Sequence, residues 1–267
     1  MWISSRLDRV LIVNIMEIML TDRQQKLIAT IIETYVETAE PVSSGLIGKA
    51  GGFAVSSATI RNEMNELEQG GYLVQLHTSG GRIPTDRAYR HYVNCILAQK
   101  DLEPGAPVKK KVALALDDLD ENDPHEINKV LAKLVSELSD SLVIANVLDS
   151  RDFFKVGLAG LFEHPEFREF EKTFRVTSFF EEFENLFETM EKELVRGIKE
   201  EFFPNFRIMI GRENPVEEVK DETVMLARYH LPQNYLGSLT IVGPTRMDYQ
   251  KNIALIKYLT GELNRIF

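Results

Sequence analysis

One stretch of the chain carries side chains of the types that recognise base edges in DNA. It runs from Ser56 to Thr85 and reads SSATIRNEMNELEQGGYLVQLHTSGGRIPT. Arginine can donate a pair of hydrogen bonds to guanine, asparagine can pair with adenine, and serine and threonine can bond to either base. If the segment begins with a helix, its exposed side presents Ser57, Thr59, Arg61, Asn62 and Asn65. The chemistry that this pattern indicates is hydrogen-bonded recognition of a duplex.

Two earlier helices are expected to position this one. TDRQ, from Thr21, has the spacing of a capping box, and the residues after it place one apolar stripe on a helix: Leu27, Ile28, Ile31, Ile32, Tyr35 and Val36. Pro41 ends that helix, and Ser43 or Ser44 can cap a short second one reaching about Ala50. Gly51 and Gly52 then turn the chain toward the third helix.

The third helix is expected to be followed by a hairpin and a further helix. Ser56 or Ser57 caps it, Ile60, Met64 and Leu67 face the core, and Gly70 and Gly71 end it. Residues 72–85 then form a hairpin around a glycine-rich tip, and a helix covers about 85–98 with Tyr89, Tyr92, Val93, Ile96 and Leu97 inward. Three helices and a hairpin predict a winged helix-turn-helix, in which the third helix enters the major groove.

This layout predicts two sets of DNA-binding residues. The recognition helix supplies Ser56, Ser57, Thr59, Arg61, Asn62 and Asn65. The wing and its flanks supply Ser43, Ser44, His77, Thr78, Ser79, Arg82, Arg87 and Arg90. The spacing alone also fits an ordinary helical head whose Arg61 and Asn62 are solvated surface residues and whose Gly80–Gly81 is a plain tight turn.

The net charge of the whole chain opposes DNA binding, but its distribution does not. The 267 residues have a formal net charge of −10. Residues 1–98 contain nine Lys or Arg and ten Asp or Glu, so nearly all of the excess acidity lies beyond them. Attraction to phosphate decays over about 8–10 Å at ordinary ionic strength. Whether the chain can bind DNA therefore depends on the charges on the local surface of residues 1–98, and not on the net charge of the whole chain.

A linker is expected at residues 100–107, KDLEPGAP, since it is polar and contains proline. Helical patterns follow at about 108–116, 123–138 and from Asp248, and another helix places Phe180, Phe183, Phe187, Met190 and Leu194 on one face. Strand patterns begin at Leu142, Phe206, Thr223 and Gly237. The fold class is therefore α+β with a small, largely antiparallel sheet. The predicted domains are a poorly ordered extension 1–19, a winged-helix domain 20–99, the linker 100–107 and a second domain 108–267.

No catalytic, cofactor or metal site is expected. Cys95 follows His91 at i+4 but falls among residues expected to face the core, so we interpret it as a buried structural cysteine. The five histidines have no metal-ligand spacing.

GPTRMDY, from Gly243, turns a strand into the last helix, with Asp248 as its cap and Arg246 in an ion pair. The apolar run VLIVNIMEIML is too short and polar for a membrane span, and a single cysteine suits a reducing cytoplasm.

Several of these blocks together resemble one family. VSSATIRNEMNELEQGGYLVQLHTSGGRIPT and RAYRHYVN, with EPVSS upstream and GLAGLFEHPEF, IGREN and GPTRMDY downstream, closely resemble the bacterial heat-inducible transcription repressor HrcA. The resemblance implies a homodimeric, cytoplasmic repressor that binds an inverted-repeat operator, CIRCE, ahead of chaperone operons and is released on heat stress. It also implies a GAF-like second domain and the chaperonin GroEL as a partner that assists the DNA-binding form.

One feature departs from the family. Its members usually carry a long segment inserted in the GAF-like domain and thought to help dimerisation, but here SDSLVIANVLDS runs almost directly into RDFFKVGLAGLF. The operator-reading residues are unaffected, whereas the way in which two copies associate is open. The alternative from another class is a GAF-like ligand-binding or enzymatic protein whose helical head docks a protein partner.

Overall fold

The structure is a computed structural model that describes residues 20–50, 52–76, 80–99, 101–120, 123–148, 150, 152–196 and 205–267. It divides into two compact units, Met1–Ala88 and Tyr89–Phe267. The predicted N-terminal extension, residues 1–19, lies outside the described residues. The division falls inside a helix, whereas the sequence places the domain boundary at residues 100–107, so the predicted domain limits stay a prediction.

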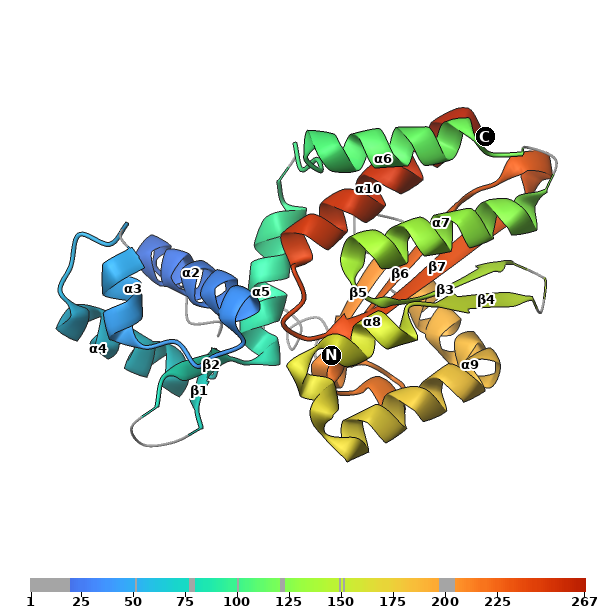
Figure 1. Ribbon diagram of the computed structural model, residues 1–267. Coiled ribbons are helices and arrows are strands. Elements are labelled where there is room, and N and C mark those ends of the chain that lie inside the picture. The colour runs from blue at the N-terminus through green and yellow to red at the C-terminus, as the bar shows by residue number, and fades with distance from the viewer. Residues whose placement is uncertain are drawn as a thin grey trace, which may run out of the picture. The chain divides into compact units, whose positions relative to one another are not determined.

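The first unit contains the three expected helices, each with a polar cap (Figure 1). Helix α2 spans Asp22–Thr38, and Thr21 and Gln24 exchange the hydrogen bonds of a capping box. Helices α3, Ser44–Ala50, and α4, Ser57–Gln69, follow. The Ser43 and Ser56 hydroxyl oxygens accept from the amides of Leu46 and Thr59, both at 3.2 Å. The first serine of each predicted pair is therefore the cap.

The wing is a short hairpin joined to the segment before α3. Strands β1, Leu73–Gln75, and β2, Arg82–Pro84, pair antiparallel. Val42 and Arg82 also form a bridge in which each amide donates to the other's carbonyl at 2.9 Å. Gly81 permits this approach, because a Cβ there would lie 2.5 Å from the carbonyl carbon of Pro41 and 2.6 Å from that of Val42.

Helix α5, Asp86–Leu97, contains the point where the two units divide. Tyr89, Val93 and Ile96 are buried, as predicted. The prediction of a buried cysteine is wrong, because Cys95 is exposed. It lies two residues, or about 200° around the helix, from the buried Val93, which places it on the opposite side.

The second unit is built on a five-stranded antiparallel sheet in the order β4-β3-β7-β6-β5. The strands are β3 Leu142–Val147, β4 Phe153–Val156, β5 Phe206–Ile210, β6 Glu222–His230 and β7 Leu236–Pro244. Strands β6 and β7 form the hairpin that the sequence predicts. Strand β4 was not among the predicted strands, since its four residues alternate too briefly to give a period.

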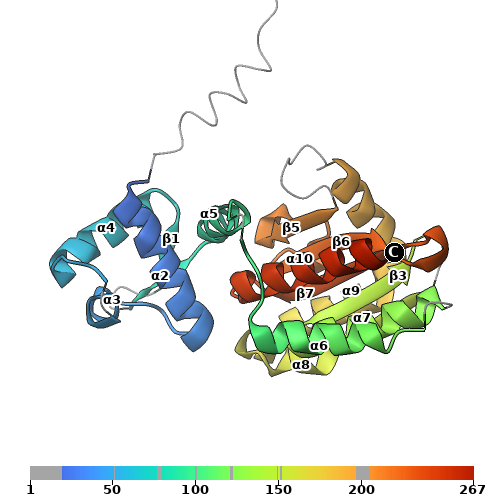
Figure 2. The same cartoon turned by 90° about the horizontal axis from the view of Figure 1, so that it is seen from above.

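Helices cover both faces of this sheet (Figures 1 and 2). Helices α7 and α10 lie on one face with α6 outside them, and α8 and α9 lie on the other. Their bounds are α6 Ala106–Asp117, α7 Pro124–Ser139, α8 Leu158–Glu163, α9 Phe170–Arg196 and α10 Tyr249–Ile266. Four single turns complete the unit: η1 Pro165–Arg168, η2 Gly211–Glu213, η3 Glu217–Val219 and η4 Pro232–Asn234. The α+β class is confirmed.

The main core lies between the sheet and α9. Phe179, Phe183, Phe187 and Met190 pack on Leu142, Ile144, Val224, Leu226 and Val242. The predicted aromatic stripe is thus confirmed at Phe183, Phe187 and Met190, while Phe180 lies partly buried at its margin and Phe179 takes the central place. Among the described residues, no helix is both long and apolar enough to cross a membrane.

The close approach at Gly81 gives a first prediction. Gly81→Ala forces its new methyl group into the backbone of Pro41 and Val42, so we expect the free energy of unfolding of the first unit to fall by about 1–3 kcal/mol. Gly45→Ala, in α3, is the matched control, because the nearest atom to its Cβ is 3.9 Å away. Thermal unfolding followed by circular dichroism measures both, and equal midpoints for the two variants would contradict this role of Gly81.

Candidate nucleic-acid interface

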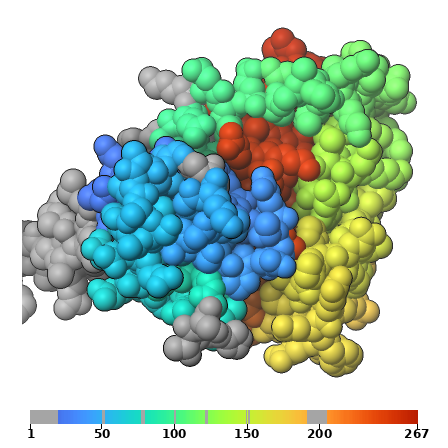
Figure 3. All heavy atoms as spheres, turned by 60° about the vertical axis from the view of Figure 1, so that its left-hand side comes forward, coloured from blue at the N-terminus to red at the C-terminus, as the bar shows by residue number. Residues whose placement is uncertain are grey.

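The leading end of α4 presents the expected polar side chains on the surface. Figure 3 shows the first unit, which contains this helix, as a space-filling view coloured by residue number. Ser57, Arg61 and Asn62 are exposed, and Thr59 is half-buried. Arg61 has no hydrogen bond or ion pair to another described residue. Its guanidinium is therefore available to a ligand, as recognition of a base edge requires.

The acidic residues of α4 all have partners within the first unit. Arg23 of α2 binds Glu63 by an ion pair. The side-chain amide of Gln24 donates to Glu66 at 2.9 Å, and Nε of Arg82 donates to Glu68 at 2.9 Å. Two of the three glutamates are thus neutralised by arginine. The sequence indicates Gln24 only as part of a capping box with Thr21 and gives no signal for the contacts of Arg23 and Gln24 with α4.

Arg82 is an internal clamp of the wing. Its side chain is only 11% exposed, and besides Glu68 it donates from Nη2 to Oδ1 of Asn65. Its backbone forms the bridge to Val42. Two residues predicted to contact DNA, Arg82 and Asn65, are therefore bound to each other and fix β2 against α4.

Of the other residues predicted to bind DNA, two serines serve as helix caps, one serine is buried, and the wing tip is not described. The hydroxyls of Ser43 and Ser56 serve as helix caps, and that of Ser56 also lies 3.1 Å from the Thr59 hydroxyl. Ser44 is buried. His77, Thr78 and Ser79 lie outside the described residues.

Arg87 is exposed, and one of its donors is bound to the C-terminal end of α4. Its Nη1 donates to the carbonyl of Gly70 at 2.9 Å, and the guanidinium carbon lies 4.6 Å from the centroid of the Tyr72 ring. A cation at this position favours the C-terminal end of α4, where the helix dipole is negative. Arg87 therefore stabilises α4 while its remaining donors face solvent.

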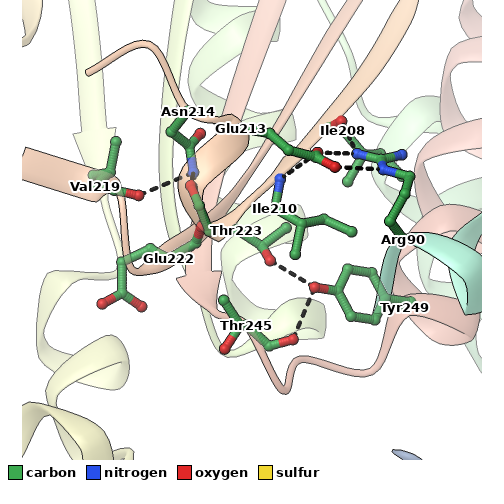
Figure 4. A network of polar contacts seen from close by, with 11 residues as sticks. Arg90, Ile208, Ile210, Glu213, Asn214, Val219, Glu222, Thr223, Thr245 and Tyr249 are labelled. Carbon is green, nitrogen blue, oxygen red and sulfur yellow. Dashed lines mark hydrogen bonds and ion pairs between the residues drawn. The ribbon is translucent and has the colours of Figure 1, made fainter. Parts of the chain in front are cut away.

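Arg90 belongs to the second unit, where Glu213 holds it in a bidentate ion pair (Figure 4). Its Nε donates to Glu213 at 2.8 Å and its Nη2 to the carbonyl of Ile208 at 2.7 Å. The same carboxylate accepts from the amide of Ile210 at 2.9 Å. These donors are thus directed into the second unit, so the structure does not place Arg90 with Arg61 and Asn62.

The blocks that carry the family resemblance in the second unit are structural. In IGREN, the Asn214 side-chain amide donates to the carbonyls of Gly211, Val219 and Glu222 at 2.8–2.9 Å (Figure 4). In GPTRMDY, Asp248 caps α10 by accepting from the amide of Lys251, and Arg246 pairs with Glu166. Both predictions for GPTRMDY are confirmed.

Buried carboxyl groups of this region have displaced pKa values. Burial raises the pKa of Glu222 to about 7, although Lys172, 3.4 Å away, opposes the shift. For Glu166, burial is the largest effect and acts to raise the pKa, but the hydrogen bond and charge of Arg246, a backbone hydrogen bond and the charge of Lys172 together hold the pKa below normal. Glu222 is 1% exposed, so its ionisation bears directly on the stability of the fold.

The described residues contain no group of three or more His, Cys, Asp or Glu side chains that could hold a metal ion. Sγ of Cys95 lies 3.8 Å from Nε2 of His91.

Comparison with known proteins identifies relatives over nearly the whole chain. The family model described as HrcA protein C terminal domain matches residues 87–253. The heat-inducible transcription repressor HrcA of Lachnoclostridium phytofermentans is 28% identical, covering 93% of this chain and 98% of the relative. That of Clostridioides difficile is 25% identical, covering 92% and 99%.

The relatives are longer than this chain inside the matched region. The alignment with the Lachnoclostridium protein runs over 341 positions, more than the 267 residues present here. A solved structure titled "Crystal structure of a hypothetical protein at 2.2 A resolution" has the same fold, with a TM-score of 0.71 at 20% identity over 93% of this chain and 98% of that one.

Glu222 gives a prediction with a defined pH dependence. Because its folded pKa, about 7, lies above the ordinary value of 4.5, its carboxyl contributes stability that is complete below pH 4.5 and is lost as the pH rises through 7. Glu222→Gln removes this loss, so we expect it to be more stable than the parent protein by about 2 kcal/mol near pH 8 and equal to it below about pH 5.

Urea unfolding at several pH values measures this difference. Glu217→Gln is the control, since that side chain is 74% exposed and should change little at any pH. A Glu222→Gln protein that is less stable than the parent at high pH would contradict the assignment of a poorly ionised carboxyl.

Proposed function

The chain belongs to the HrcA family, and from this premise we propose that it represses heat-shock genes by placing the leading end of α4 in the major groove of operator DNA. The observation that carries the proposal is the pairing of the glutamates of α4 within the first unit. Arg23 and Arg82 neutralise Glu63 and Glu68, Gln24 donates a hydrogen bond to Glu66, and the guanidinium of Arg61 has no partner among the described residues. A chain with a negative net charge can therefore present a local surface that does not repel the DNA phosphates.

We assign direct recognition to the exposed end of α4. Arg61 and Asn62 can bond to base edges, and Ser57 and Thr59 lie one turn earlier, where the helix N-terminus favours phosphate. Arg87 has free donors for a phosphate next to its bond to Gly70. Arg82 and Asn65 act as positioning residues, because their polar atoms are bound to each other.

An inverted-repeat operator of the CIRCE type requires two copies of the head, so the functional state that we propose is a homodimer. The relatives also support a cytoplasmic regulator without catalytic activity. Assistance by the chaperonin GroEL, and release of the operator on heat stress, complete the proposal and rest on the family resemblance.

The alternative, a GAF-like ligand-binding protein, has one feature in its favour. A hollow of about 290 Å³ in the second unit is lined by Glu103, Pro104, Val108, Leu138, Lys251 and Leu255, among others. This volume is at the lower limit for small-molecule sites, and no nearly buried, unpartnered polar group is among the lining residues. The exposed recognition face of α4 favours the repressor.

Replacement of Arg61 tests whether its side chain contacts the bases of the operator. Arg61→Ala should weaken binding to a CIRCE-type duplex by about 1–3 kcal/mol and reduce discrimination against a scrambled duplex, since one bidentate base contact is lost. Its thermal midpoint should not change, because the side chain has no partner among the described residues. Lys110→Ala, which removes one exposed cation from the second unit, is the control. Unaltered discrimination in fluorescence anisotropy would exclude Arg61 from base reading.

Arg82 should behave differently. Arg82→Ala leaves Glu68 and Asn65 without their partner, so we expect a lower thermal midpoint together with weaker binding to both operator and scrambled DNA. The loss of stability should be about 1–2 kcal/mol. If the variant keeps its midpoint and loses only operator binding, Arg82 contacts bases directly and its role as a clamp is wrong.

A further inference from the structure

Two phenylalanines at the start of α9 are left on the surface of the second unit. Phe170 is 83% exposed and Phe174 is 62% exposed. Their rings stack with centroids 6.2 Å apart and an interplanar angle of 24°. They occupy successive turns of one helix face, so they form one apolar patch. We call Phe170 and Phe174 the α9 patch.

The α9 patch lies on the side of α9 that faces away from the core. Phe179, Phe183 and Phe187 form the buried stripe of the same helix and pack on the sheet. At 100° per residue, Phe170 and Phe174 lie on the opposite side from that stripe. Helix α9 is also the outermost element on its side of the sheet (Figure 1). The pair therefore contributes nothing to the core of its own chain.

We propose that the α9 patch is the centre of a two-fold contact with a second copy of this chain. This inference deepens the proposed function, because it rests on the proposal that two heads bind one inverted repeat. A two-fold contact places the same patch on both copies. If the two helices are antiparallel, Phe170 of each copy packs against Phe174 of the other copy. The two-fold axis makes these two contacts identical.

The charges along α9 favour this antiparallel arrangement. Beyond Phe174 the helix exposes Glu181, Glu182, Glu184 and Glu188. Antiparallel helices that meet at their first turns carry these glutamates away from each other, whereas a parallel pair would align them and repel. Glu169 and Glu171 are exposed beside the patch and offset the positive ends of the two helix dipoles where they meet.

The size of the α9 patch predicts a weak dimer. A buried phenylalanine covers about 150–250 Å², so two rings supply about 300 Å² from each copy, less than the roughly 800 Å² per partner of a stable interface. We therefore expect association at micromolar concentrations in solution, completed on DNA when two half-sites hold two heads next to each other.

Sedimentation equilibrium of the full chain tests the contact. The double variant Phe170→Ser, Phe174→Ser should weaken self-association by at least about tenfold. Leu114→Ser is the matched control, since Leu114 is an exposed apolar residue of α6, 56% exposed, outside the patch. Both variants should keep the parent thermal midpoint, because the replaced side chains are largely solvated. A double variant that dimerises as tightly as the parent overturns the inference, and so does a parent protein that stays monomeric both in solution and on the full operator.

Gel shifts separate this inference from the proposed function. We expect the double variant to bind a duplex with one CIRCE half-site as the parent does and to lose cooperative binding to the full inverted repeat. If the parent itself binds neither duplex better than a scrambled one, the proposed function fails. If the double variant binds the full repeat with parental cooperativity, only the assignment of the α9 patch fails.

Discussion

The first unit depends on one guanidinium. Arg82 binds Glu68 and Asn65 of α4 through its side chain and Val42 through its backbone, so a single residue joins the recognition helix, the wing and the segment before α3. Gly81 allows this by leaving room for the backbone of Pro41 and Val42. Because Arg82 is bound in this way, we propose that DNA recognition rests on side chains of α4 such as Arg61, which has no partner among the described residues.

The same contacts explain how an acidic chain can present a DNA-binding surface. Glu63, Glu66 and Glu68 would repel phosphate if they were free, but Arg23 and Arg82 pair with Glu63 and Glu68, and Gln24 donates a hydrogen bond to Glu66. Ions in solution screen charges farther away than about 10 Å, so the charges nearest to the leading end of α4 have the largest effect on DNA. What remains on the leading end of α4 is Arg61 with neutral polar neighbours. Local pairing, and not net charge, sets the sign of this surface.

The sequence was sufficient for the features that are local along the chain. The caps at Thr21, Asp248 and the two serine pairs, the stripe of α2, the aromatic face of α9 and the β6–β7 hairpin follow from spacing alone. It was insufficient where contacts join distant residues. The bonds from Arg82 to Asn65 and from Arg90 to Glu213, the latter 123 positions apart, have no periodic signal, so the sequence indicates these arginines only as candidates for DNA contact. The prediction that Cys95 is buried is wrong because too many positions of the short helix α5 were assigned to its core-facing side.

In the DNA-bound state that we propose, the leading end of α4 lies in the major groove. Iron-chelate cleavage tests it most directly: Asn62→Cys, made in a Cys95→Ser background because Cys95 is exposed, carries the reagent at this end of the helix. A helix held in the groove should give cuts confined to one short region of each operator half-site and none in a scrambled duplex. Cuts spread evenly along the operator, or equal to those from the same reagent on Lys110→Cys, would contradict it.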